Sequence, residues 1–131
     1  MAVATNVELP RIVVRRTVAE ATPIPMGKTL KFTGTNTAAE SAADGDPFAG
    51  ITTEEFKGGE GITQVSVALD GVWMMDTTGG AIASGNMVSI GGNQQIAKTV
   101  GTADLLDGSQ FGRAEMTKDG DARIRVRLGG V

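Results

Sequence analysis

Apolar and polar side chains alternate at the C-terminal end of the chain. Ala122, Ile124, Val126 and Leu128 take every second position, and an arginine stands in each gap between them. Successive side chains leave a strand on opposite faces, so this period of two predicts a strand with one buried face and one charged face. A half-buried strand needs neighbours, and the chain upstream must supply them.

Short β-prone runs recur along the rest of the chain. Glycine-rich turns separate them, and no segment has the apolar spacing of a long amphipathic helix. Eight or nine short strands at this spacing predict an all-β fold, a small barrel or sandwich. The runs lie at residues 11–16, 28–33, 48–51, 62–69, 72–75, 87–90, 94–100, 110–116 and 122–128.

The N-terminal 22 residues are expected to form an extended arm with a proline connector, ahead of a β-barrel-like domain at residues 23–131. Pro23 and Pro25 exclude a helix or a central strand directly after the run at 11–16. That run has two interpretations: an edge strand of the same domain, or an arm that adds a strand to another chain. Its residues are Arg11, Ile12, Val13, Val14, Arg15 and Arg16.

Residues 34–61 are poor in apolar side chains and rich in acidic ones. We expect a long, exposed acidic loop here, interrupted by a short buried strand at 48–51. A long loop in a small domain is either functional or mobile.

The composition removes several kinds of chemistry. The 131 residues suit one domain, and they include no histidine, cysteine or tyrosine. This inventory excludes disulfides and catalysis by Ser-His-Asp, Cys-His or histidine-bound metals. We therefore expect no enzymatic activity, no cofactor and no metal site.

Charge and hydropathy narrow the partners. The net charge of −3 argues against non-specific nucleic-acid binding, which needs clustered positive charge. The longest apolar runs are far shorter than the about 20 residues of a membrane-spanning helix. The N-terminus lacks the layout of a secretion signal, so synthesis in the cytoplasm is the expectation.

Two groups of residues are candidates for a subunit interface. Trp73 is either a core anchor or an interface hot spot. Met74 and Met75 point to opposite faces of a strand, so one face of that strand meets something other than the core. The last strand exposes Arg123, Arg125 and Arg127, which form either a solvated face with acidic neighbours or a contact with another subunit.

From about residue 24 to residue 131, the chain resembles the capsid decoration (cement) proteins of tailed phages and related viruses. The stretches that carry the resemblance are residues 46–51, 65–73, 111–114 and 122–131. It implies a β-rich homotrimer without enzymatic activity in the virion, on the outer surface of the icosahedral capsid. There it would sit near threefold and quasi-threefold positions and clamp neighbouring major capsid proteins, with the N-terminal arm reaching into the lattice.

A second hypothesis remains open. The chain is then a non-viral β-barrel module that binds a carbohydrate or another small ligand through the acidic loop at 34–61. The single tryptophan and the absence of tyrosine count against a carbohydrate platform, because such platforms stack sugars on aromatic rings.

Overall fold

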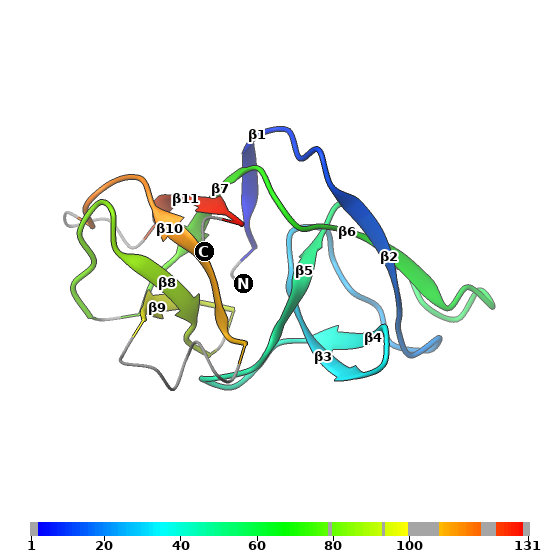
Figure 1. The fold of residues 1–131 in the computed structure, drawn as a ribbon. Helices are drawn as coiled ribbons and strands as arrows, with labels where there is room; N and C mark the ends of the chain where they lie inside the picture. Colours follow the sequence, from blue (N-terminus) through cyan, green and yellow to red (C-terminus); the bar gives the residue numbers. More distant parts are fainter. Residues whose placement is uncertain (1–2, 79, 93, 100–107, 119–122, 130–131) are drawn as a thin grey trace.

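The computed structural model describes residues 3–78, 80–92, 94–99, 108–118 and 123–129, and strands dominate it (Figure 1). Within these ranges there are eleven strands, which confirms the all-β class; none of the described segments forms a helix that could cross a membrane. The strands are β1 (Thr5–Glu8), β2 (Val13–Thr17), β3 (Thr29–Gly34), β4 (Thr37–Glu40), β5 (Phe48–Thr52), β6 (Gln64–Ala68), β7 (Val72–Asp76), β8 (Met87–Ile90), β9 (Ile96–Lys98), β10 (Gln110–Ala114) and β11 (Arg123–Leu128).

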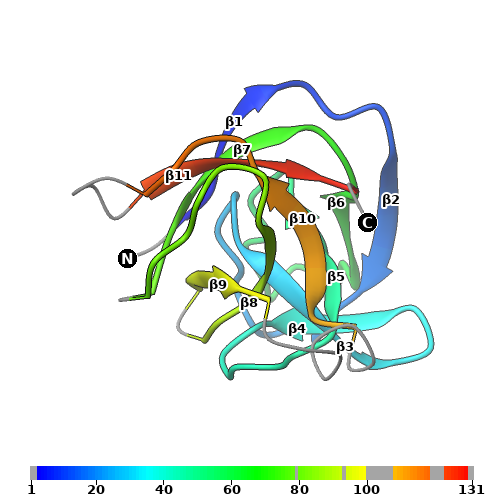
Figure 2. The ribbon, with the colours of Figure 1, turned by 60° about the vertical axis from the view of Figure 1, so that its left-hand side comes forward.

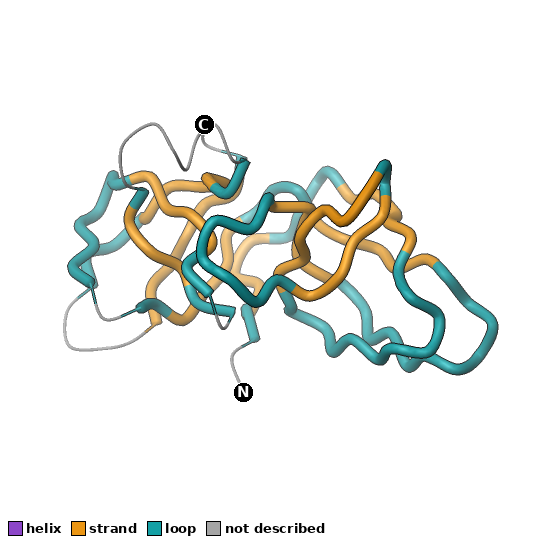
Figure 3. Tube along the Cα trace, turned by 90° about the horizontal axis from the view of Figure 1, so that it is seen from below, coloured by secondary structure: helices purple, strands orange, loops and turns teal. Residues whose placement is uncertain are grey.

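The strands form two units that lie side by side (Figures 1 and 2). The first is a closed barrel in the order β2-β4-β3-β5-β6. The second is a six-stranded sheet in the order β1-β7-β11-β10-β8-β9. Seen from below, the strands gather in two groups along the longer dimension of the molecule (Figure 3).

The alternating pattern of the last strand places β11 inside the six-stranded sheet. Ile124 and Val126 are fully buried, and they stand opposite Met75 and Trp73 of β7. The arginines between them point to the other face, as the period of two requires. Ala122, which the sequence pattern also included, lies outside the described residues.

Each unit has its own apolar cluster, and the two clusters are joined by barrel residues. Ile51 of β5 and Ala68 of β6 are fully buried in the cluster of the six-stranded sheet. Phe48 of β5 stacks on Phe111 of β10 with ring centroids 4.5 Å apart. The barrel and the sheet therefore share buried apolar surface, and we expect them to fold as one unit.

The side chain of a glutamine links the two units through hydrogen bonds. Gln94 follows β8 and reaches the barrel between β3 and the segment after β4. Its amide nitrogen donates to the main-chain oxygens of Thr29 (3.0 Å) and Ser41 (2.7 Å). Its amide oxygen accepts the Thr29 N–H at 2.8 Å. The side chain thus supplies hydrogen bonds that a neighbouring strand would otherwise make.

The N-terminal segment, which the sequence predicts as an extended arm, contains two strands. β1 pairs antiparallel with β7, and β2 pairs with β6 along its whole length. Val14 packs against the barrel core, whereas Ile12 and Val13 are 53% and 48% exposed. β1 therefore belongs to the six-stranded sheet, and β2 belongs to the barrel.

The acidic stretch also contains a strand that the pattern did not predict. β4 pairs with β3 through a tight turn at Asn36, which has a positive φ of 53°. Its Ala38 is only 2% exposed. Alanine carries a weak strand signal, which is why the pattern predicted a loop at the position of β4.

Candidate interaction surfaces

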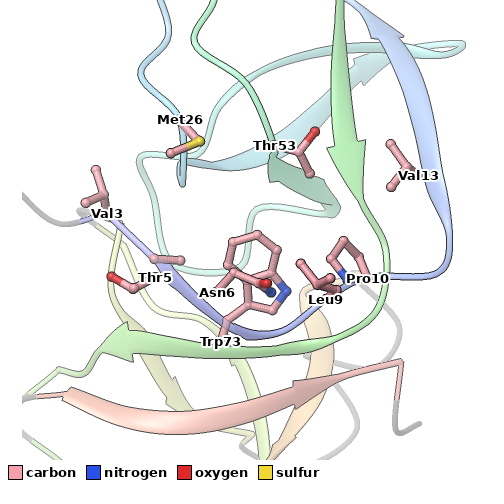
Figure 4. Close-up of a pocket in the computed structure, with 10 residues that line it drawn as sticks. Val3, Thr5, Asn6, Leu9, Pro10, Val13, Met26, Thr53 and Trp73 are labelled. Atoms are coloured by element: carbon pink, nitrogen blue, oxygen red, sulfur yellow. The ribbon is translucent and has the colours of Figure 1, made fainter.

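A groove of about 550 Å³ lies between residues 3–10, which we call the strap, and the barrel (Figure 4). None of the described side chains that line it is charged. The strap contributes Val3, Ala4, Thr5, Asn6, Leu9 and Pro10. The opposite wall and the floor come from Val13, Met26, Thr53 and Trp73.

Hydrogen bonds fix the strap at both ends of the groove. At one end, the Ala4 N–H donates to the Gly27 carbonyl oxygen at 2.7 Å. At the other, one carboxylate oxygen of Asp70 accepts the N–H groups of Arg11 (2.8 Å) and Ile12 (2.9 Å). The groove is therefore held open by the fold itself and needs no ordering when something binds.

Glycine allows the strap to approach closely. Gly71 has a φ of +96°, and a Cβ atom built there would lie 2.8 Å from the Glu8 carbonyl oxygen. Any other residue would strain its own backbone and push the strap outward. The Asp70-Gly71 pair, which the sequence predicts as a turn, thus also clamps the strap.

The floor of the groove is rigid and its rim is exposed. The Trp73 side chain is 4% exposed, and its ring nitrogen donates to the Asp70 carbonyl oxygen at 3.1 Å. At the rim, Leu9 is 85% exposed and Met26 is 60% exposed. Large apolar side chains with this exposure beside an uncharged hollow are typical of a surface that binds an apolar partner.

The structure places the predicted interface residues on β7 and β11, which are neighbours. Trp73 and Met75 point into the core, where they are 4% and 2% exposed. Met74 lies half-buried on the opposite face, directly across from Arg125. Of the three, only Met74 can therefore meet another subunit across the outer face of this sheet, while Trp73 meets the groove.

Acidic neighbours hold two of the three arginines of β11. Arg123 binds the Asp76 carboxylate at 2.8 Å. Arg127 binds Glu115 at 2.7 Å and Glu8 at 3.2 Å. The hydrogen bond to Glu115 raises the pKa of Arg127 above its ordinary value, so this guanidinium stays charged.

Arg125 is the exception among these arginines. It is exposed, and no ion pair joins it to another described residue. Of the three arginines of β11, Arg125 is therefore the one whose guanidinium is available to bind another protein.

The six residues at 11–16 have separate roles in the structure. Val13 lines the groove, whereas Val14 faces the barrel core. Arg16 of β2 donates to the Asn36 side chain, in the turn before β4, at 2.9 Å and to the Ala49 carbonyl oxygen of β5 at 3.2 Å. Its guanidinium also lies 4.8 Å from the centre of the Phe32 ring.

Sequence reasoning missed the groove because its walls come from distant segments. Leu9 and Met26 belong to no alternating run, so the sequence pattern did not predict that they lie at a groove. One signal was present, however: Leu9 is a large apolar residue directly before a proline, between the charged residues Glu8 and Arg11.

No family model and no curated protein matches this sequence. In three dimensions, the chain is similar to the crystal structure of the head fiber gp8.5 N base in bacteriophage phi29. The TM-score is 0.54 at 15% sequence identity, and the match covers 90% of this chain and 93% of that one. At this identity the likeness concerns the fold, which the two chains share over nearly their whole lengths.

Proposed function

We propose that this chain is a structural protein of a viral head: a capsid decoration protein without enzymatic activity. It binds the outer surface of the assembled icosahedral capsid as a homotrimer, near threefold and quasi-threefold positions, and stabilises the shell. The observation that carries the proposal is the fold shared with a phage head fiber base over 90% of the chain. The lack of histidine, cysteine and tyrosine supports a mechanical role.

The groove supports attachment to a large protein surface. Because the strap is already tied to Gly27 and Asp70, binding costs little conformational entropy. Three grooves on one trimer would act together, since the second and third contacts become intramolecular. A protein that binds only the assembled shell stabilises it by mass action, so weak single contacts are enough.

The outer face of the six-stranded sheet supports the homotrimer. Met74 and Arg125 stand opposite each other on neighbouring strands, and no ion pair joins Arg125 to another residue that the structure describes. A subunit contact there would bury an apolar side chain beside an arginine, the combination enriched at protein interfaces.

Capsid binding tests this proposal directly. Purified protein is mixed with capsids that come from the virus that encodes it but lack this protein. After sedimentation, the amount of the protein in the capsid pellet is measured. We expect saturable binding, an increase in the temperature at which the shell opens, and density on the outer surface in electron microscopy. Light scattering of the free protein should give the mass of a trimer. Protein that never sediments with any capsid would contradict the proposal.

A non-viral ligand-binding module is the second candidate, and the groove itself favours it. Its volume of about 550 Å³ lies in the range typical of small-molecule sites, roughly 300–1,000 Å³. The hollow beside Glu54, Glu55 and Glu60 in the acidic segment is smaller, about 120 Å³. Native mass spectrometry would separate the candidates, because a co-purified small molecule of fixed mass supports this one.

A further inference from the structure

The six-stranded sheet has two ends, and one of them is covered. At the β9 end, the Thr78 N–H donates to the Ile96 carbonyl oxygen at 2.9 Å. The segment after β7 therefore curls round to protect β9. β1 forms the other end, and among the described strands it pairs with β7 alone. A strand edge of this kind can pair with a strand of another chain.

The free edge of β1 faces the groove. Alternate residues of a strand direct their main-chain groups to opposite sides. The Leu128 N–H reaches the Gly71 carbonyl oxygen, so Gly71 and Trp73 face β11, and Met74 faces β1.

In the same register, Thr5 pairs with Met74, so the main-chain groups of Ala4 and Asn6 face away from β7. The bond from the Ala4 N–H to Gly27 of the barrel agrees with this direction. From this register we infer that the main-chain N–H and C=O of Asn6, a residue that lines the groove, face away from β7 and toward the groove.

The residues that line the groove determine which side chains an added strand can place there. Asn6 and Trp73 stand opposite each other on one face of the sheet, and both line the groove. A strand paired with β1 would place every second side chain on that face, over Trp73. The lining residues that the structure describes hold no charge to neutralise a charged side chain, so they favour an apolar one.

We infer that the groove receives an extended, uncharged segment of the capsid shell protein, which pairs with β1 and inserts a large apolar side chain above Trp73. The identity of this partner rests on the proposed function. The N-terminal segment would then take part in strand addition as the acceptor, with its own residues fixed in the fold, and not as a donated arm.

Charge at the rim tests the occupant. Leu9→Glu and Met26→Glu combined place two carboxylates beside the groove at side chains that are 85% and 60% exposed, so the fold should tolerate them. Ile62→Glu is the matched control, because Ile62 is 52% exposed and lies outside the groove. We expect capsid affinity to fall about tenfold or more in the double variant and to stay unchanged in the control.

The same measurement of capsid affinity distinguishes failure of the proposed function from failure of the proposed role of the groove. Wild-type protein that fails to bind capsids contradicts the proposed function. Wild-type and double-variant proteins that bind equally well leave that function standing and overturn the role of the groove.

Two substitutions at one position test the strand pairing. Asn6→Ala removes the side chain but keeps the N–H that faces the groove, whereas Asn6→Pro removes both. Proline is tolerated in edge strands when its nitrogen faces away from the neighbouring strand. We expect Asn6→Pro to bind several-fold more weakly than Asn6→Ala at equal melting temperature. Equal affinity of the two variants would exclude main-chain pairing.

A photo-reactive residue at position 9 identifies the occupant even where a variant folds poorly. In protein bound to capsids, cross-linked peptides should come from one uncharged segment of the shell protein. Cross-links to a second copy of this chain, to a charged segment, or to no protein at all would overturn the inference.

Discussion

The barrel and the six-stranded sheet are made of the same kind of short strand, but only the barrel closes. Its two end strands meet at Thr17 and Thr37. Beside them, the Arg16 side chain donates to the Asn36 side chain. The sheet ends at β1, whose outer edge borders the groove. Closure satisfies the main chain internally, so a partner strand can be added at the sheet but not where the barrel has closed.

Although the edges of the barrel and the sheet differ, the two units do not pack independently of each other. Ile51 and Ala68 of the barrel lie in the core of the sheet, and Phe48 stacks on Phe111. A substitution that destabilises the barrel should therefore also destabilise the six-stranded sheet.

Deletion of residues 2–16 should have the largest effect. It removes β1 and most of β2, which opens the barrel and uncovers Val65 and Val67 of β6. We expect loss of the cooperative thermal transition in far-ultraviolet circular dichroism. Deletion of residues 2–8 is the control, because it leaves the barrel strands intact and should retain a transition. A folded protein after the longer deletion would show that the segment is a separable arm.

Leu30→Ala in the barrel should destabilise the whole molecule. Leu30 is fully buried, and such a truncation typically costs about 2–5 kcal/mol. Trp73 lies in the sheet, so its fluorescence reports on the other unit. We expect fluorescence and circular dichroism to shift together to the same lower denaturant midpoint. Thr33→Ala, at an exposed position of the same strand, should change little. Separate midpoints would mean that the two units unfold independently.

Gly71→Ala should loosen the strap. The added methyl group would meet the Glu8 carbonyl oxygen while the backbone is forced to a positive φ. Gly59→Ala is a matched control, because Gly59 has a φ of +73° but open space around it. Gly59→Ala should cost about 1 kcal/mol, and Gly71→Ala about 1–3 kcal/mol more in denaturant unfolding. Equal costs would show that the strap yields without resistance.

Asp46→Asn should have the smallest effect, and it should depend on pH. Burial raises the pKa of Asp46, but the N–H groups of Ala43 and Ala42 and the charge of Lys31 outweigh it, so the pKa lies below its ordinary value. A lowered pKa in the folded state stabilises the protein above the pKa of the unfolded state. This contribution is lost as the pH falls through the folded pKa.

We therefore expect Asp46→Asn to lose about 1 kcal/mol at pH 7 and to approach the wild type in acid. The free energy of unfolding, measured between neutral and strongly acidic pH, gives this comparison. Asp44→Asn, two residues away and exposed, serves as the control. A constant difference at every pH would mean that the Asp46 charge does not matter.

Much of the fold was determined by the sequence through side-chain burial. Ile124, Val126 and Leu128 alternate with arginines because one face of β11 meets a core and the other meets water. Such alternation, together with short β-prone runs between turns, located nine of the eleven strands among the described residues. Asp70 and Gly71 predicted the turn between β6 and β7 from their own local chemistry.

Only the tertiary structure decided where β1 lies and that a groove exists. The side chains of β1 are mostly exposed and do not alternate, since this strand is held by main-chain bonds to β7 and its strap by contacts with Gly27 and Asp70. Main-chain groups are the same in every residue, so pairing through them leaves no mark on the local pattern. A hollow between distant segments depends on how these segments pack, which the pattern of any one of them does not contain.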